Sequence, residues 1–389
     1  MDRTLQTYMK ELLSQVDNAF QRYKYNQIDW NLRLVCLTGP RGVGKSTMVL
    51  QHIANNPQEN ALYVSADHSY FTTHTLIELA DEFVKDGGEH LYIDEVHKYT
   101  GWSRELKQIY DTHPGLKVFV TGSSILDLLD GEADLSRRMV IDHMYGLSLR
   151  EYLKMVHHVE VPIFSLQEIL EGKAHMGSIQ HPLPYFKEYL RKGYYPFTSE
   201  GAFYTRLEQI IRQTVEADIV QYAHISLSTG RKILQMLRIM SANVPYKPEA
   251  QALANELKIS RNVIPDYLAY LERAGMIGML RDNTCGMRGL GKMEKVYIDN
   301  TNMLYAMVGE EVEIGNLRET FFYNQTRVVH NVAASRESDF CIGNYTFEVG
   351  GRKKGKKQIQ DIPNSFVVRD DIEYAVDNII PLWAFGLMY

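Results

Sequence analysis

Hydrophobic and polar positions follow two rhythms along this 389-residue chain. Between residues 4 and 23, large apolar side chains recur every three or four positions, which predicts an amphipathic helix packed on the next domain. From residue 32 to about residue 145, short apolar runs alternate with segments that permit helices. The runs are LRLVCL, ALYVSA, HLYIDE, LKVFVT and RRMVIDHM. This alternation predicts an α/β fold, with a parallel sheet and helices on both of its faces.

The remaining residues predict three further segments. Aromatic-rich helical patterns interrupted by prolines predict a helical lid or linker over 151–230. A helix, turn and helix pattern around Ser260 predicts a winged helix-turn-helix over 231–294, and strands alternating with polar loops predict a small α+β domain over 295–389. With an N-terminal helix in 1–30 and a sheet domain in 31–150, we expect five segments.

Composition narrows the class of protein. A hydrophobic fraction of 45% and a charged fraction of 23% are typical of compact, soluble domains. Charged residues interrupt the first twenty positions, so we expect no secretory signal there. The longest apolar stretch, 379–389, is about half the ~20 residues that a membrane helix needs, and we interpret it as a buried strand. The three cysteines lack CxxC spacing. These features predict a cytoplasmic protein without a membrane partner.

The net charge of −6 limits contact with nucleic acid to local basic patches. One such patch, Arg352 to Lys357, contains five basic residues. It is either a phosphate-binding surface for DNA or a solvated loop.

A glycine-rich motif follows the first apolar run. It satisfies GxxxxGK followed by Ser or Thr, and the helix-forming run MVLQHIA comes next. Its glycines permit a tight turn whose N–H groups converge on phosphate oxygens, at the positive end of the following helix. A chance glycine-rich turn is the alternative. The motif predicts an ATP site made of Gly39, Pro40, Arg41, Gly42, Val43, Gly44, Lys45, Ser46 and Thr47.

Each polar side chain of this motif has an expected role. Lys45 should contact the β- and γ-phosphates in binding and catalysis, and Ser46 should bind Mg²⁺ through its hydroxyl. Thr47 is then available to an α-phosphate oxygen.

Two carboxylates end the apolar run HLYIDE. Asp94 is expected to hold Mg²⁺ through water, and Glu95 to polarise the attacking water. An acidic pair that merely caps a strand is the alternative. Because this pair and the glycine-rich motif occur together, they predict a Mg²⁺-dependent ATPase.

Further candidates follow the strand VFVT. Ser123 is either a γ-phosphate sensor or a plain strand-to-helix cap. Arg137 and Arg138 offer guanidinium groups that can neutralise transition-state charge, in cis or from a neighbouring subunit of a homo-oligomer. Ion pairing with Asp134 or Asp142 is the alternative for these arginines.

At these positions the chain resembles bacterial and archaeal AAA+ ATPases that join an AAA+ domain to a winged helix and a C-terminal nuclease-like domain. The resemblance covers nearly the whole chain and rests on the P-loop, DEVH followed by Trp102 and ELKQIYD, TGSS, DLSRR and LSLREYL. It implies that Arg138 is the family's arginine after the sensor strand. Arg137 stands where many members have glycine, so the choice between the two arginines stays open.

The same resemblance implies a PD-(D/E)xK nuclease fold at the C-terminus. Its acids would be Glu319, Asp339 and Glu348, but Gly350 occupies the lysine position, and the nearest basic residues in sequence are Arg352 and Lys353. Without that lysine, a positive group that orients the nucleophile is missing or displaced. We therefore expect a degenerate nuclease-like domain that serves as a binding surface.

Three functions remain as hypotheses. The first is an ATPase whose nucleotide state rearranges the winged-helix and C-terminal domains. The second is a nucleic-acid-binding regulator that binds ATP with negligible turnover, and the third is an ATP-gated nuclease. A winged helix docks proteins as well as DNA, so the partner stays open between DNA and protein.

Overall fold

The computed structural model describes residues 3–122, 135, 137–247, 250–282, 292–351 and 359–389. The chain divides into two compact units, Met1–Tyr145 and Gly146–Tyr389, and each is described by itself. Among the described residues, no helix is long and apolar enough to cross a bilayer.

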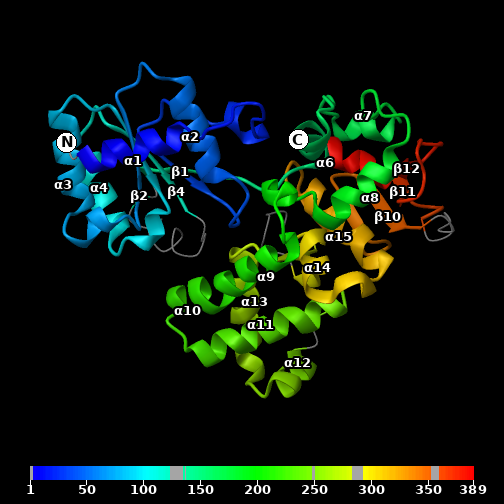
Figure 1. The fold of residues 1–389 in the computed structure, drawn as a ribbon. Coiled ribbons are helices and arrows are strands. Elements are labelled where there is room, and N and C mark those ends of the chain that lie inside the picture. The colour runs from blue at the N-terminus through cyan, green and yellow to red at the C-terminus, as the bar shows by residue number, and fades with distance from the viewer. Residues whose placement is uncertain (1–2, 123–134, 136, 248–249, 283–291, 352–358) are drawn as a thin grey trace. The chain divides into compact units, whose positions relative to one another are not determined.

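Unit 1 is built on a five-stranded sheet in the order β2-β3-β4-β1-β5. Strands β1, β2 and β4 of this sheet are labelled in Figure 1. Every neighbouring pair of strands is parallel. The strands coincide with the five apolar runs, and their residues are almost all buried in β1 to β4, as expected for a sheet covered on both faces. The predicted α/β class is confirmed. The strands are β1 (Leu34–Thr38), β2 (Ala61–Ser65), β3 (His90–Asp94), β4 (Lys117–Thr121) and β5 (Val140–His143).

Helices flank this sheet. They include α1 (Arg3–Leu13), α2 (Lys45–Asn55), α3 (Leu76–Lys85) and α4 (Trp102–Thr112). Helix α1 packs against β2 and α2, and Leu5 joins the apolar cluster that lies between the sheet, α3 and α4.

The first helix is shorter than the pattern over 4–23 predicted. It ends at Leu13, and the Asp17 carboxylate accepts a hydrogen bond from the Ala19 N–H at 2.8 Å. Aspartate competes in this way with helical hydrogen bonding and favours a turn. The apolar spacing beyond this point therefore does not continue the helix.

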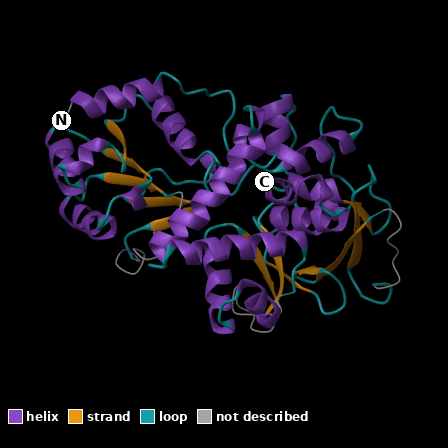
Figure 2. Ribbon diagram, turned by 60° about the horizontal axis from the view of Figure 1, so that its bottom comes forward, coloured by secondary structure: helices purple, strands orange, loops and turns teal. Residues whose placement is uncertain are grey.

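Unit 2 begins with helices and a hairpin (Figure 2). Strands β6 (Ile277–Arg281) and β7 (Met293–Ile298) pair in antiparallel fashion. Pro265 lies in the first turn of α13, where the missing N–H is tolerated. The order of α11, α12, α13 and hairpin matches the predicted pattern, and a winged helix stays a prediction. The helices are α6 (Leu149–His157), α7 (Leu166–Leu170), α8 (Pro182–Lys192), α9 (Phe203–Gln213), α10 (Ile219–Tyr222), α11 (Leu227–Ala242), α12 (Ala250–Leu257) and α13 (Ile264–Arg273).

A second five-stranded sheet completes unit 2, in the order β12-β11-β10-β9-β8. Strands β8, β9 and β10 are antiparallel, whereas β10, β11 and β12 are parallel. Helix α15 packs against β10. This sheet and its helices comprise α14 (Thr301–Val308), α15 (Ile314–Thr326), β8 (Val332–Ala334), β9 (Phe340–Ile342), β10 (Tyr345–Gly350), β11 (Ser365–Arg369) and β12 (Ile379–Pro381).

The apolar stretch 379–389 is only partly a strand. Strand β12 ends at Pro381, and residues Leu382–Leu387 form a 3₁₀ helix that packs against α6 and α15. The expectation of one continuous buried strand is wrong because proline has no N–H to continue a ladder. The burial itself is as expected, since the residues from Leu382 to Tyr389 are all buried.

Candidate nucleotide-binding site

The glycine-rich loop connects the end of β1 to the start of α2. Gly39, Gly42 and Gly44 have φ values of 146°, 79° and 94°, a region in which side chains are strained. A Cβ atom at Gly39 would lie 2.2 Å from the Met144 carbonyl oxygen. The loop conformation therefore requires glycine at these positions and leaves its backbone open to a ligand.

Lys45 is the first residue of α2 and is only 6% exposed. Its Nζ donates to the carbonyl oxygens of Gly39 at 2.6 Å and Pro40 at 2.8 Å. Burial lowers the pKa of Lys45 to about 8. The first N–H groups of a helix have no partner inside it, so this lysine and the α2 N-terminus present donors to one place. A cradle of glycines, backbone donors and a lysine fits a chain of phosphates.

Asp94 ends β3 and is 7% exposed. Hydroxyl groups from both neighbouring strands donate to it: Tyr63 to Oδ2 at 2.8 Å, and Thr121 to Oδ1. Sequence reasoning missed both residues. The available signal was that β2, β3 and β4 are consecutive parallel strands, whose carboxyl ends meet at one edge of a sheet.

Glu95 follows Asp94 with a left-handed backbone, φ 48° and ψ 43°. This conformation is strained for a residue other than glycine, and such strain clusters at functional sites. The Glu95 N–H donates to the Thr121 hydroxyl at 3.1 Å, so Thr121 fixes both carboxylate residues. The Glu95 Oε1 lies 3.5 Å from Arg41 Nη1 in the glycine-rich loop. The structure thus brings Arg41, Lys45, Asp94 and Glu95 into one site.

The segment after α1 supports the glycine-rich loop. Arg22, 5% exposed, donates to the Val43 carbonyl oxygen and, at 2.8 Å, to the Tyr145 carbonyl oxygen. Gln51 of α2 donates to the carbonyl oxygens of Asp17 and Phe20 at 2.7 and 2.8 Å. These contacts hold the loop and its helix from outside. Sequence pattern did not reveal them, because they join backbone carbonyls to side chains far apart in the chain.

The structure places Arg138 beside α4. Arg138 forms a two-bond ion pair with Asp111 of α4, from Nε at 2.9 Å and Nη2 at 3.1 Å. The described partner of Arg138 is thus Asp111, while Asp142 pairs with Lys24 and Asp134 lies outside the described residues. Arg137 is exposed. Ser123 and the basic patch from Arg352 to Lys357 also lie outside the described residues.

Unit 2 contains a second group of carboxylates. Lys295 of β7 places its Nζ 3.3 Å from Glu319 Oε2 and 3.1 Å from Asp339 Oδ1. The Tyr297 hydroxyl donates to Glu319 at 2.7 Å. Burial and the Asp339 charge raise the pKa of Glu319. The third predicted acid, Glu348, accepts a hydrogen bond from the Ser338 hydroxyl instead.

Lys295 places near these acids a cation that Gly350 does not supply. The cation comes from an earlier strand, so a search near Arg352 and Lys353 could not find it. Within the described ranges, no three His, Cys, Asp or Glu side chains are placed to hold a metal ion. Lys295 thus lies between Glu319 and Asp339.

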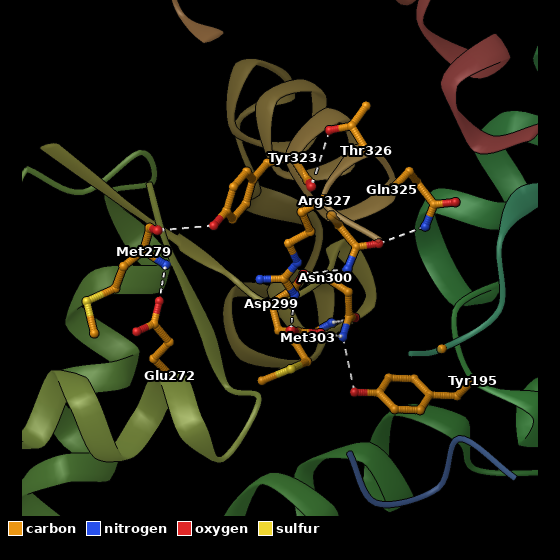
Figure 3. Close-up of polar contacts among 12 residues, drawn as sticks. Tyr195, Glu272, Met279, Asp299, Asn300, Met303, Tyr323, Gln325, Thr326 and Arg327 are labelled. Atoms are coloured by element: carbon orange, nitrogen blue, oxygen red, sulfur yellow. Dashed lines mark hydrogen bonds and ion pairs between the residues drawn. The ribbon is translucent and has the colours of Figure 1, made fainter. Parts of the chain in front are cut away.

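A buried polar network joins the parts of unit 2 (Figure 3). Arg327 pairs with Asp299, and the Asn300 amide donates to the Tyr195 hydroxyl at 3.1 Å. The Tyr323 hydroxyl donates to the Met279 carbonyl oxygen at 3.1 Å. These residues belong to three of the segments that the sequence analysis predicted, 151–230, 231–294 and 295–389. Because their polar groups satisfy one another inside the core, we interpret the network as structural.

Two family models match parts of the chain. Residues 31–153 match a model described as an AAA domain, and residues 183–313 match one described as a domain of unknown function, DUF8612. No curated protein matches the sequence.

Several solved structures are similar at low identity. The Walker-type ATPase PABY2304 of Pyrococcus abyssi is 13% identical, with a TM-score of 0.45 over 74% of this chain and 96% of that one. AMPPCP-bound DnaA from Aquifex aeolicus is 12% identical, with a TM-score of 0.29 over 70% and 89%. The S. cerevisiae Hsp104–ADP complex is 15% identical, with a TM-score of 0.32 over 68% and 41%.

The AAA match covers all five strands of the parallel sheet, the glycine-rich loop and the carboxylate pair. The matched residues 31–153 are accordingly similar to an AAA domain of the P-loop ATPase class.

Proposed function

We propose that this chain binds ATP with Mg²⁺ at residues 39–47 and hydrolyses it. The supporting observation is the buried Lys45 inside a glycine cradle, in the same site as Asp94 and Glu95. Lys45 is influenced by the charges of both carboxylates, which counteract the effect of burial on its pKa. This combination provides a cation for phosphate and carboxylates for metal and water.

Each residue has a specific task. Lys45 and the backbone N–H groups of the loop hold phosphate oxygens, with Thr47 at the α-phosphate. Ser46 and Asp94 would hold Mg²⁺, because Mg²⁺ in such sites is bound through few carboxylates. When bound there, Mg²⁺ would neutralise charge on the phosphates. Glu95 accepts a hydrogen bond from the attacking water and orients it.

Arg41 gives the site a means of regulating Glu95. Its guanidinium lies 3.5 Å from the Glu95 carboxylate, a distance at which the pair is weakly held. Guanidinium groups bind phosphate oxygens readily. When Arg41 turns to a phosphate, it releases Glu95 to orient water.

Ser123, Arg137 and Arg138 extend this proposal. Ser123 senses the γ-phosphate, and one of the two arginines stabilises transition-state charge. Arg138 must first leave Asp111, whereas Arg137 is exposed and can reach a neighbouring subunit. The nucleotide state then changes the arrangement of unit 2, so that unit 2 binds a DNA or protein partner. We place this activity in the cytoplasm. Gel filtration with and without ATP tests for the homo-oligomer that action by Arg137 in trans requires.

Phosphate release by the purified chain in Mg²⁺ tests the proposal, with and without DNA. We expect hydrolysis that stops when EDTA removes Mg²⁺. ATP binding without measurable phosphate release would instead support a regulator with negligible turnover.

We further propose that unit 2 is not a nuclease. The observation that favours this is Lys295, whose ammonium group lies between Glu319 and Asp339. A divalent ion at these acids has to displace that cation. Plasmid nicking in Mg²⁺ or Mn²⁺ should therefore be absent. Cleavage that disappears on Asp339→Ala and persists on Lys45→Ala would contradict this proposal.

A further inference from the structure

Tyr63 reaches from the middle of β2 to the proposed metal site. It is 3% exposed, and its hydroxyl donates to Asp94 Oδ2 at 2.8 Å. A tyrosine hydroxyl keeps its proton at neutral pH, because its ordinary pKa is about 10. Tyr63 is therefore a permanent, neutral donor to Asp94.

The same hydroxyl contacts Ser46. The two side chains share a hydrogen bond, and the tyrosine oxygen accepts it because its single proton is donated to Asp94. A hydroxyl has one proton to donate and lone pairs to accept with. The two hydrogen bonds therefore run in one direction: Ser46 donates to Tyr63, and Tyr63 donates to Asp94. Three different elements, α2, β2 and β3, meet at this single oxygen atom.

The contacts of Asp94 leave its charge available. Tyr63 and Thr121 occupy one lone pair on each carboxylate oxygen, and both are neutral hydroxyls. The carboxylate is held in orientation without a side-chain cation bonded to it in the described residues. Each oxygen keeps capacity for a further hydrogen bond from a metal-bound water.

We propose that Tyr63 is a positioning residue, which holds the side chains of Ser46 and Asp94 in the orientation that binds a divalent cation. Its hydroxyl contributes to affinity for Mg²⁺ in the nucleotide complex and little to affinity for the nucleotide alone. This inference rests on the proposed ATP site and adds a residue outside both sequence motifs. Outer residues that orient ligands typically contribute about 10- to 100-fold to metal affinity.

Tyr92 offers a matched control for Tyr63. The two tyrosines are direct partners across β2 and β3, and Tyr92 is 2% exposed. The Tyr92 hydroxyl donates to Glu59 at 3.3 Å instead of to the metal site. Phenylalanine at either position preserves the ring and removes only a hydroxyl. A general effect on packing should therefore appear in both variants.

The experiment is calorimetry of ATP binding in EDTA and in Mg²⁺, with Mn²⁺ bound in the ATP complex measured by electron paramagnetic resonance. For Tyr63→Phe we expect nucleotide affinity in EDTA within about twofold of wild type and Mn²⁺ affinity reduced roughly tenfold. Tyr92→Phe should match wild type in both measurements. Combining Tyr63→Phe with Ser46→Ala should cost less than the sum of the two changes, because the residues act through one contact.

The outcomes separate this inference from the function on which it rests. Wild-type protein that binds no ATP in either buffer overturns the proposed function and, with it, the role of Tyr63. Wild-type protein with Mg²⁺-dependent affinity that Tyr63→Phe retains in full overturns the positioning role alone. Equal losses in EDTA and in Mg²⁺, or equal losses in Tyr92→Phe, would assign Tyr63 to packing and also overturn the inference.

Discussion

Two carboxylate pairs in this protein have the same side-chain chemistry but different partners. In unit 1, Asp94 accepts hydrogen bonds from neutral hydroxyls, and Glu95 lies at the edge of hydrogen-bond distance from Arg41. In unit 2, Glu319 and Asp339 share the ammonium group of Lys295. Burial lowers the pKa of that lysine, but the two carboxylates outweigh burial and raise it. The second pair therefore keeps its internal cation at neutral pH.

The difference shows what makes an acidic cluster receptive to a metal. Neutral donors orient a carboxylate without bonding a cation to it, so an external cation can bind the carboxylate and lower the free energy of the site. A lysine compensates the charge from within, and an external cation gains little by replacing it. Acidic residues in a sequence are therefore not enough to predict a metal site, because their hydrogen-bond and ion-pair partners decide whether they attract a metal ion.

The largest expected effect concerns the carboxylate pair of unit 1, Asp94 and Glu95. Glu95→Gln should keep ATP and Mg²⁺ binding but reduce turnover roughly 10²-fold or more, because an amide is a poor proton acceptor for water. Phosphate release and calorimetry measure the two quantities, and exposed Glu82→Gln serves as the control. Normal turnover in Glu95→Gln would show that another residue positions the water.

The next effect concerns Lys45, which we propose binds a phosphate, whereas Lys295 pairs with two carboxylates. Lys45→Ala should weaken ATP binding by about 10- to 100-fold, the scale of lost charge-assisted hydrogen bonds. Calorimetry measures it, with the exposed Lys85→Ala as control. Unchanged affinity would refute the assignment of the P-loop.

Removing the lysine from the carboxylate pair of unit 2 should have a smaller effect and make that pair behave more like the pair of unit 1. Lys295→Met removes the hydrogen bonds of Glu319 and Asp339 to a charged group, and we expect the stability of unit 2 to fall by roughly 2 kcal/mol. Mn²⁺ should restore part of the lost melting temperature in this variant but not in wild type. Lys292→Met removes a lysine that is 78% exposed and should do neither. If Lys295→Met is as stable as wild type, the ion pairs carry little of the fold.

The smallest effect is on the pH dependence of unit 1. His52 stacks on Trp30 with ring centres 3.8 Å apart, and burial lowers the pKa of His52 from 6.5 to about 4. Between these values the unfolded chain binds a proton that the folded chain does not, so stability falls as pH falls from 6.5 toward 4. His52→Phe retains an aromatic ring and should reduce this loss. Melting temperatures at pH 7.5 and 5.5 measure it.

The control for this pH effect is His181→Phe in unit 2, because the His181 side chain is 76% exposed. It should leave the pH dependence of unit 1 as in wild type. An unchanged pH dependence in His52→Phe would assign the acid sensitivity to other groups, such as His90, whose pKa burial also lowers.

The predictable parts of the molecule are those encoded in short segments. Five apolar runs sufficed for the parallel sheet, and the spacing of Gly39, Gly44 and Lys45 sufficed for the loop, because strand burial and tight turns depend on neighbouring residues. Tyr63 and Lys295 were not predicted. Each acts on a residue more than twenty positions away, and only strand order and packing bring the partners together.

Element ends were predicted less well than element types. The helix that ends at Leu13 and the strand that ends at Pro381 both stop inside continuing apolar patterns. In each case a local backbone preference, from Asp17 or from Pro381 itself, overrides the periodicity. Apolar spacing reports which residues are buried, and it does not report which backbone conformation buries them.

The packing of residues 382–389 against α6 has a consequence for the order of folding. The Ser148 hydroxyl, which caps α6, donates to the Tyr389 carbonyl oxygen at 2.7 Å, across 241 positions. A contact of this separation closes a long loop and forms late, whereas unit 1 contains all its strands within its first 145 residues. During synthesis, unit 1 can therefore be complete while α6 still waits for its partner.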